Sequence, residues 1–218
     1  MVAGWTILLP AGMLVARFFK VTPRQNWPSS LDNKFWWLCH VRLQAAGLAL
    51  VLIGLALVYR HGTASSGLAY AHHVGGWLVI GIGALQLISG LLRGSKGGPT
   101  AAAMRGDHYD MTPRRVIFEY LHKTLGWAAM VVAICVTAAG LVLVDAPRWM
   151  AVVIGFWWAA YALVFIWLQA KRRCVDTYQA IWGPDTRHPG NRRAPIGWGI
   201  HRPPSPETED GEGHRTRQ

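Results

Sequence analysis

The sequence predicts an all-α integral membrane protein, folded as a bundle of five transmembrane helices. Only 15% of its 218 residues are charged and 52% are hydrophobic, whereas about a quarter of the residues of a soluble protein are charged. Several apolar stretches reach the roughly 20 residues that a helix needs to cross a bilayer. The chain also contains 12 tryptophans, a residue that concentrates at membrane–water boundaries.

The predicted spans follow one another closely and are joined by short loops. Four are clear, at residues 35–59, 69–92, 116–144 and 149–170. A fifth, at residues 1–19, is barely long enough. We interpret it as a span because it lacks the basic leading segment of a cleaved signal peptide. Thr112-Pro113 predicts the start of the fourth helix, with a capping hydroxyl followed by proline. Asp145-Ala146-Pro147 predicts a tight turn before the last helix.

Loop charges predict which end of the bundle faces the cytoplasm, where lysine and arginine concentrate. The other end has only Arg60 and Arg148 near the membrane. The basic end has Arg17, Lys20, Arg24, Lys34, Arg93, Lys96, Arg105, Arg114, Arg115, Lys171, Arg172 and Arg173. Five spans then place the N-terminus outside and the C-terminus in the cytoplasm, and we expect a bacterial inner membrane. The net charge of +11 also suits a nucleic-acid-binding protein, but long apolar runs argue against nucleic acid as a partner.

The composition changes after the last predicted span. We expect a transmembrane domain at residues 1–172 and a cytoplasmic, largely disordered tail at 173–218, because the tail is polar and rich in Pro, Gly and Arg. Cys39, Cys135 and Cys174 are expected to be free thiols. The chain contains no Cys-x-x-Cys-His motif, which excludes a covalently attached c-type haem.

Four histidines lie within or at the ends of the predicted spans, where ionisable residues are costly and often functional. His40 and His122 begin two helices that run in the same direction, so they lie at the same depth near the basic end. His72 and His73 begin a helix of opposite direction and lie near the other face. Two imidazoles at one depth on two helices of a bundle are the ligand set of a bis-histidine haem b.

Neighbouring residues fit this interpretation. Gly126 follows His122 by four residues and Gly76 follows His72 by four, which places each glycine on the face of its histidine and leaves room for a flat macrocycle. Gln44, at the same spacing after His40, is a hydrogen-bonding candidate. The basic residues near this depth could pair with haem propionates or extend to the lipid headgroups. They are Arg17, Arg42 and Lys123.

Other interpretations of the histidines remain open. A single histidine in a membrane helix can simply bond a backbone carbonyl. Zinc is a weaker alternative, since it takes three or four ligands and only two histidines meet at each face. Matching depth, the repeated His-x-x-x-Gly spacing and the lack of a carboxylate partner favour haem. A haem-free transporter or scaffold with structural histidines is the alternative function, although short loops and unbroken helices argue against transport.

The motifs resemble the cytochrome b561 family, in particular the membrane domain found elsewhere with DOMON domains. The resemblance runs from Trp5 to about Leu168. It rests on Gly4-Trp5-Thr6-Ile7-Leu8-Leu9-Pro10, Ala16-Arg17-Phe18-Phe19-Lys20, Phe35-Trp36-Trp37-Leu38-Cys39-His40, Ala71-His72 with Gln86 and Gly90, and Tyr120-Leu121-His122-Lys123-Thr124-Leu125-Gly126.

This resemblance implies two b-type haems that pass electrons across the membrane. It assigns His40 and His122 to the haem at the cytoplasmic side, and it favours His72 over His73 because Gln86 follows His72 at the family's spacing. The family's partner for His72 is a histidine eight residues before the tryptophan that matches Trp5, a position upstream of Met1. We therefore expect either a start codon further upstream, with that histidine encoded there, or one complete haem and an incomplete second site.

The sequence leaves the partners of such a protein open. Ascorbate, quinone and ferric iron are all candidate electron donors or acceptors. A third interpretation of the function is a subunit that anchors a soluble redox partner. A homo-oligomer is a candidate assembly. Membrane lipid is the one partner that the composition itself predicts.

Overall fold

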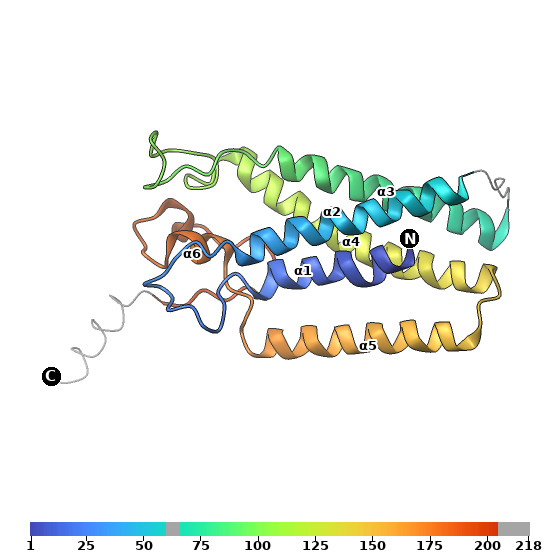
Figure 1. Cartoon of the computed structure of the whole chain (residues 1–218). Coiled ribbons are helices and arrows are strands. Elements are labelled where there is room, and N and C mark those ends of the chain that lie inside the picture. The colour runs from blue at the N-terminus through green and yellow to red at the C-terminus, as the bar shows by residue number, and fades with distance from the viewer. Residues whose placement is uncertain (60–65, 205–218) are drawn as a thin grey trace.

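The computed structural model describes residues 1–59 and 66–204, and within them every regular element is a helix. Four long helices and one short helix run side by side as a bundle, and loops gather at one end (Figure 1). The long helices are α2 (Phe35–Val58), α3 (Gly67–Leu91), α4 (Pro113–Leu143) and α5 (Arg148–Ala170). All four are long and apolar enough to span a membrane, which confirms the predicted membrane helical bundle.

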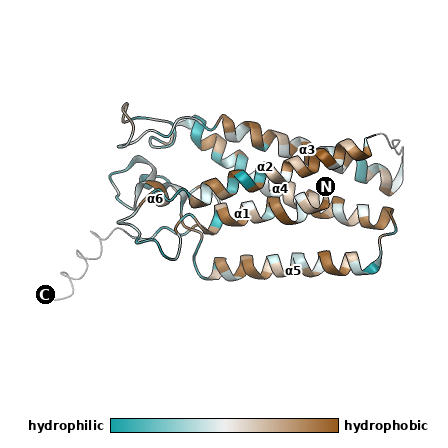
Figure 2. Cartoon of the chain, viewed as in Figure 1, coloured by the Kyte–Doolittle hydropathy of each residue, from teal (hydrophilic) through white to brown (hydrophobic). Residues whose placement is uncertain are grey.

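The helices of the bundle are hydrophobic along most of their length (Figure 2), and many of their large apolar side chains are exposed. Leu57, Leu91 and Phe156, for example, are 73%, 79% and 76% exposed. A soluble protein does not leave so many large apolar side chains in water. The chain is therefore a multi-pass integral membrane protein whose lipid-facing surface is built from these side chains.

The first predicted span forms a shorter helix than the others. A π-helical turn at Gly4–Leu8 leads into α1 (Leu9–Phe18), and the fifteen residues together extend about 22 Å, less than the hydrocarbon thickness of about 30 Å. Pro10 explains the irregular turn because it has no N–H to bond the carbonyl of Thr6. The indole Nε1 of Trp157 donates to that carbonyl at 2.6 Å, and Tyr161 donates to the Pro10 carbonyl at 3.1 Å. These two bonds join α5 to the π-helical turn and to α1.

The boundaries of α4 and α5 follow the sequence signals. The Thr112 hydroxyl accepts a hydrogen bond from the backbone N–H of Arg115 at 3.4 Å, with Pro113 in the first turn. Asp145 adopts a positive φ of 45° in the turn that precedes α5. Both predictions from these residues are confirmed.

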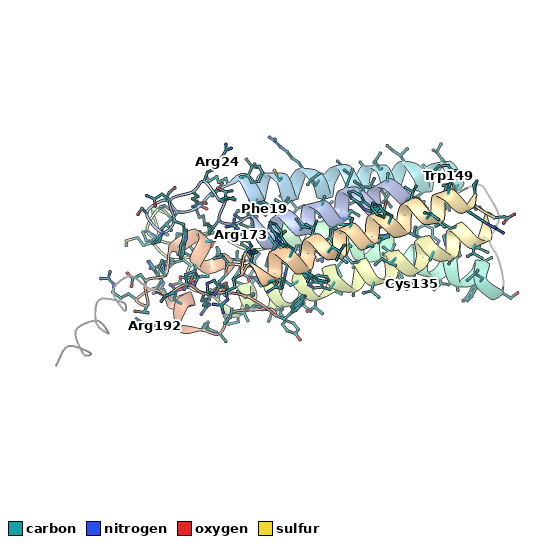
Figure 3. All side chains as sticks on the ribbon, turned by 90° about the horizontal axis from the view of Figure 1, so that it is seen from below. Phe19, Arg24, Cys135, Trp149, Arg173 and Arg192 are labelled. Atoms are coloured by element: carbon teal, nitrogen blue, oxygen red, sulfur yellow. The ribbon has the colours of Figure 1, made fainter. Side chains whose placement is uncertain are left out.

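Residues 19–34, 93–112 and 171–204 form one folded unit at the loop end of the bundle, which we call the end cap (Figure 1). The predicted disorder from residue 173 onward is wrong for residues 173–204; residues 205–218 lie outside the described part of the chain. This stretch contains α6 (Thr177–Trp182) and a 3₁₀ turn at Pro189–Arg192. Figure 3 shows Arg24, Arg173 and Arg192 at this end and Trp149 at the other, so the end cap is the basic end.

Aromatic packing explains why a segment of this composition folds. Tyr178 and Trp182 are 2% and 6% exposed and pack with Met111. Gly98 has a φ of +87°, and a Cβ there would lie 2.5 Å from the Trp182 ring. A Cβ at Gly190 would lie 2.3 Å from the Tyr178 ring. These two glycines therefore permit close contacts in the core of the end cap.

His108 gives the end cap a pH dependence. Burial, with the nearby charge of Arg115, lowers the pKa of His108 from 6.5 to about 3, so the folded state holds it neutral. Since the unfolded chain binds the proton first as pH falls below 6.5, stability is lost in that direction, by about 2 kcal/mol between about pH 7.5 and pH 5. Thermal unfolding in detergent at the two pH values should show this loss. His108→Phe, which keeps a ring and cannot titrate, should remove it; an equal loss in that variant would assign the effect to other groups.

Candidate functional site

The structure brings His40 of α2 and His122 of α4 together inside the bundle, near the end cap. Their ring centroids are 6.3 Å apart with an interplanar angle of 75°. Both side chains are partly buried. The Phe118 ring also packs near His122, with ring centroids 5.1 Å apart. The two histidines that the sequence places at the same depth in the membrane are therefore neighbours in the structure.

Each ring is oriented by a hydrogen bond through Nδ1. His40 Nδ1 lies 3.1 Å from the Gly12 carbonyl, which can only accept, so Nδ1 carries the proton. His122 Nδ1 lies 3.2 Å from the Ser89 hydroxyl. Because Ser89 donates its own proton to the Gln86 carbonyl at 3.0 Å, His122 must donate to the Ser89 oxygen. Both imidazoles thus keep the Nε2 lone pair, and no described residue donates to it.

This donor set fits a metal centre with two axial imidazoles. Metal-bound imidazoles are oriented in this way by a bond from the second nitrogen to a carbonyl or hydroxyl. Metal–imidazole nitrogen bonds are about 2 Å long, so two imidazoles on opposite sides of one ion have ring centres about 6 Å apart. The described residues contain no group of three or more His, Cys, Asp or Glu that could hold a metal. The residues present therefore fit a haem, which supplies four ligands of its own, better than they fit zinc.

The glycines and the glutamine near these histidines have other contacts. A Cβ at Gly126 would lie 3.1 Å from the Gln86 amide, which donates to the His122 carbonyl at 2.7 Å. Gly126 therefore permits the close approach of α3. Gly76 faces open space, with no heavy atom within 4 Å of its Cβ position. Gln44 donates to the Leu9 carbonyl at 2.9 Å and joins α2 to α1.

His72 lies at the opposite end of α3 and contacts a different part of α4. Its Nδ1 is 3.0 Å from the Val136 carbonyl, and a Cβ at Gly140 would lie 2.8 Å from its ring. From His122 to Val136 along α4 is about 20 Å at 1.5 Å per residue. The His73 ring instead packs near Trp77, with centroids 6.4 Å apart. Of the two adjacent histidines, His72 is the one bonded across the bundle, in the same tautomer as His40 and His122.

A buried carboxylate that the sequence motifs did not single out lies one helical turn before His122. Glu119 is 6% exposed and accepts from Arg115 at 2.8 Å and from Lys123 at 2.8 Å. His108 Nε2 lies 3.9 Å from the same carboxylate. Lys123 also donates to the Ile196 carbonyl at 2.8 Å, so this cluster joins α4 to the end cap. Glu119 is thus bonded to Arg115 and Lys123 and not to His122.

The Arg17 side chain likewise makes its hydrogen bonds at the end-cap side of the bundle. Its guanidinium donates to Gln169 at 3.0 Å and to the Trp198 carbonyl at 2.8 Å, and it lies 4.1 Å from the centroid of the Trp198 ring. Lys123 is bonded to Glu119 and Ile196. The described residues offer no hydrogen bond or ion pair to Arg42. Of the three basic residues considered for haem propionates, Arg42 alone makes no hydrogen bond or ion pair within the described chain.

Comparison with known proteins gives two relatives. Over 143 residues, 65% of the chain, it is 29% identical to a cytochrome b561, DM13 and DOMON domain-containing protein of Arabidopsis thaliana, and covers 14% of that protein. Over 142 residues, again 65% of the chain, it is 28% identical to ferric-chelate reductase 1 of Bos taurus, and covers 21% of it. The chain thus spans about a fifth or less of these relatives. No protein-family model and no solved structure matches it. The two similarities support a cytochrome b561-type family for this membrane domain.

Proposed function

We propose that this protein carries electrons across a membrane by means of a b-type haem held between His40 and His122. The observation that supports the proposal most directly is the placement of these two rings, with centroids 6.3 Å apart and with both Nδ1 atoms bonded so that both Nε2 lone pairs are available. The names of the relatives point the same way, since one is a cytochrome b561 domain protein and the other a ferric-chelate reductase.

The roles of the protein's own residues follow from their contacts. A haem supplies the one-electron chemistry when bound. His40 and His122 would hold the haem through their Nε2 atoms, and the Gly12 carbonyl and Ser89 hydroxyl would hold the rings in orientation. Phe118, packed against His122, would keep water from the ligand. Arg42 is our proposed partner for a propionate, and His72 is our proposed ligand for a second haem near the opposite end.

The test is the absorption spectrum of the protein purified from haem-replete cells. We expect a Soret band, a sharpening of the visible bands on reduction with dithionite, and about one non-covalently bound b-type haem per chain from the two paired ligands. A colourless preparation that gains no such spectrum on addition of haemin would refute the proposal and favour a haem-free transporter or scaffold.

We further propose that the end cap faces the cytoplasm. The argument is the positive-inside rule, since Arg24, Arg173 and Arg192 gather at this end (Figure 3). A reporter that is active only outside the cytoplasm should be silent when fused after Gln218, and active when fused within the turn at Asp145. The reverse pattern would invert the orientation and with it the side on which the His40–His122 site lies.

A further inference from the structure

An apolar groove lies on the outside of the bundle beside His122. Its volume is about 370 Å³, at the lower end of the range of roughly 300–1,000 Å³ for small-molecule sites. It is formed only by the end of α3 and the start of α4. The lining residues are Ser89, Leu92, Arg114, Ile117, Phe118 and Leu121.

Two of the lining residues contact His122 directly. The Ser89 hydroxyl accepts from His122 Nδ1 at 3.2 Å, and the Phe118 ring lies 5.1 Å from the His122 ring. A molecule in the groove is therefore one side chain away from a proposed haem ligand. Electron transfer depends steeply on distance, so this is a favourable position for an exchange partner of that haem.

The groove opens toward lipid. Leu92, Ile117 and Leu121 are 61%, 58% and 50% exposed on the apolar surface of the bundle. The end cap packs on another face of α4, where Lys123 bonds the Ile196 carbonyl and Trp198 packs against Trp127 with ring centroids 5.5 Å apart. The exposed apolar lining of the groove favours a partner that approaches from the bilayer.

The two polar residues of the groove define the chemistry of its occupant. The Ser89 oxygen accepts from His122 and donates to Gln86, so it keeps one lone pair that can accept an O–H. Arg114 uses one N–H on the Leu92 carbonyl at 2.8 Å and keeps further N–H donors for an oxygen. An apolar ring with an oxygen at each side matches this pattern. An acidic phospholipid would use Arg114 and leave Ser89 without a role, and a water-soluble acid does not suit apolar walls.

We propose that this groove binds the ring of a membrane-soluble quinol, which is the electron donor to the haem at His40 and His122. The inference rests on the proposed function. Oxidation of one quinol to the quinone would release two electrons and two protons. Two equivalents of the ferric haem at His40 and His122, one in each of two chains, would take one electron each, and the two protons would pass to water at the basic end. The Ser89 oxygen accepts the bond from one quinol hydroxyl, and Arg114 donates to the other oxygen.

The experiment uses the haem-loaded protein in nanodiscs of phosphatidylcholine, with decylubiquinol as the probe. We expect reduction of the haem by decylubiquinol, slowed about tenfold or more in Ile117→Trp, which fills the groove. Ile134→Trp is the matched control, because Ile134 is also an exposed isoleucine of α4 and lies outside the groove. Decylubiquinol should reduce the haem of this control variant at the wild-type rate. Both variants should keep the haem spectrum and full reduction by dithionite.

The outcomes separate the inference from the proposed function. A protein without haem refutes the proposed function itself. A haem protein that decylubiquinol does not reduce, or reduces equally fast in Ile117→Trp, refutes the quinol site alone. Native mass spectrometry tests whether a lipid occupies the groove instead. If an acidic phospholipid is bound to the wild-type protein and lost from Arg114→Gln, and if this variant oxidises quinol at the unchanged rate, the groove is a lipid site and the inference is overturned.

Discussion

His40→Ala and His122→Ala should each abolish the same low-spin haem signal. The two rings are 6.3 Å apart and would bind one iron from opposite sides, so the loss of either ligand leaves that iron five-coordinate or leaves the site empty. Electron paramagnetic resonance of the oxidised protein, together with the haem-to-protein ratio, measures the effect. We expect complete loss of the low-spin species in both variants and the same residual spectrum in each.

The matched control is His73→Ala. His73 lies near the other face and packs on Trp77, so its loss should leave the low-spin signal at the wild-type level. If His40→Ala and His122→Ala removed different haem populations, the pairing of these two histidines would be incorrect, even if both variants lost haem.

Glu119→Gln should be among the most destabilising single substitutions in the chain. The carboxylate is 6% exposed and is bonded to both Arg115 and Lys123. Neutralising it leaves the buried Arg115 cation without its partner, which costs about 3–5 kcal/mol. For a protein of this size we expect the unfolding midpoint in detergent to fall by roughly 10 °C.

Asp185→Asn provides the comparison for an exposed ion pair. Asp185 is bonded to Arg187, whose side chain is 79% exposed, and exposed pairs contribute little to stability. Its unfolding midpoint should stay within error of the wild type. A Glu119→Gln midpoint equally close to the wild type would mean that the cluster around Glu119 does not hold α4 to the end cap.

The predictability of the fold differs between the bundle and the end cap. The long helices were predictable because a membrane span imposes a length and an apolar composition, and α2 and α5 end within one residue of the predicted positions. The fold of the end cap was not predictable, because its content of Pro, Gly and Arg is also typical of a disordered tail. The informative signal was the spacing of aromatic residues, Tyr178, Trp182 and Trp198, since disordered segments are poor in them.

The candidate site was predictable only in part. The depth of His40 and His122 follows from their positions in the sequence, and the structure brings them together. The contribution of α3 could not be predicted, because the rotation of a nearly uniformly apolar helix cannot be read from its sequence; Ser89 and Gln86 therefore went unnoticed as neighbours of His122. Glu119 did carry a signal, the i,i+4 spacing to both Arg115 and Lys123, which was overlooked within an apolar run.

The order in which the chain is synthesised gives the end cap one more consequence. Residues 171–204 leave the ribosome after α1 to α5, so both histidines are already in the membrane when Ile196 and Trp198 reach α4 and Arg17. We therefore expect the end cap to restrict the aqueous entrance through which the proposed haem would be loaded, once this segment has been translated. A stop codon placed after Lys171 would keep that entrance open, and such a truncated chain should take up haemin faster, and release it faster, than the full chain.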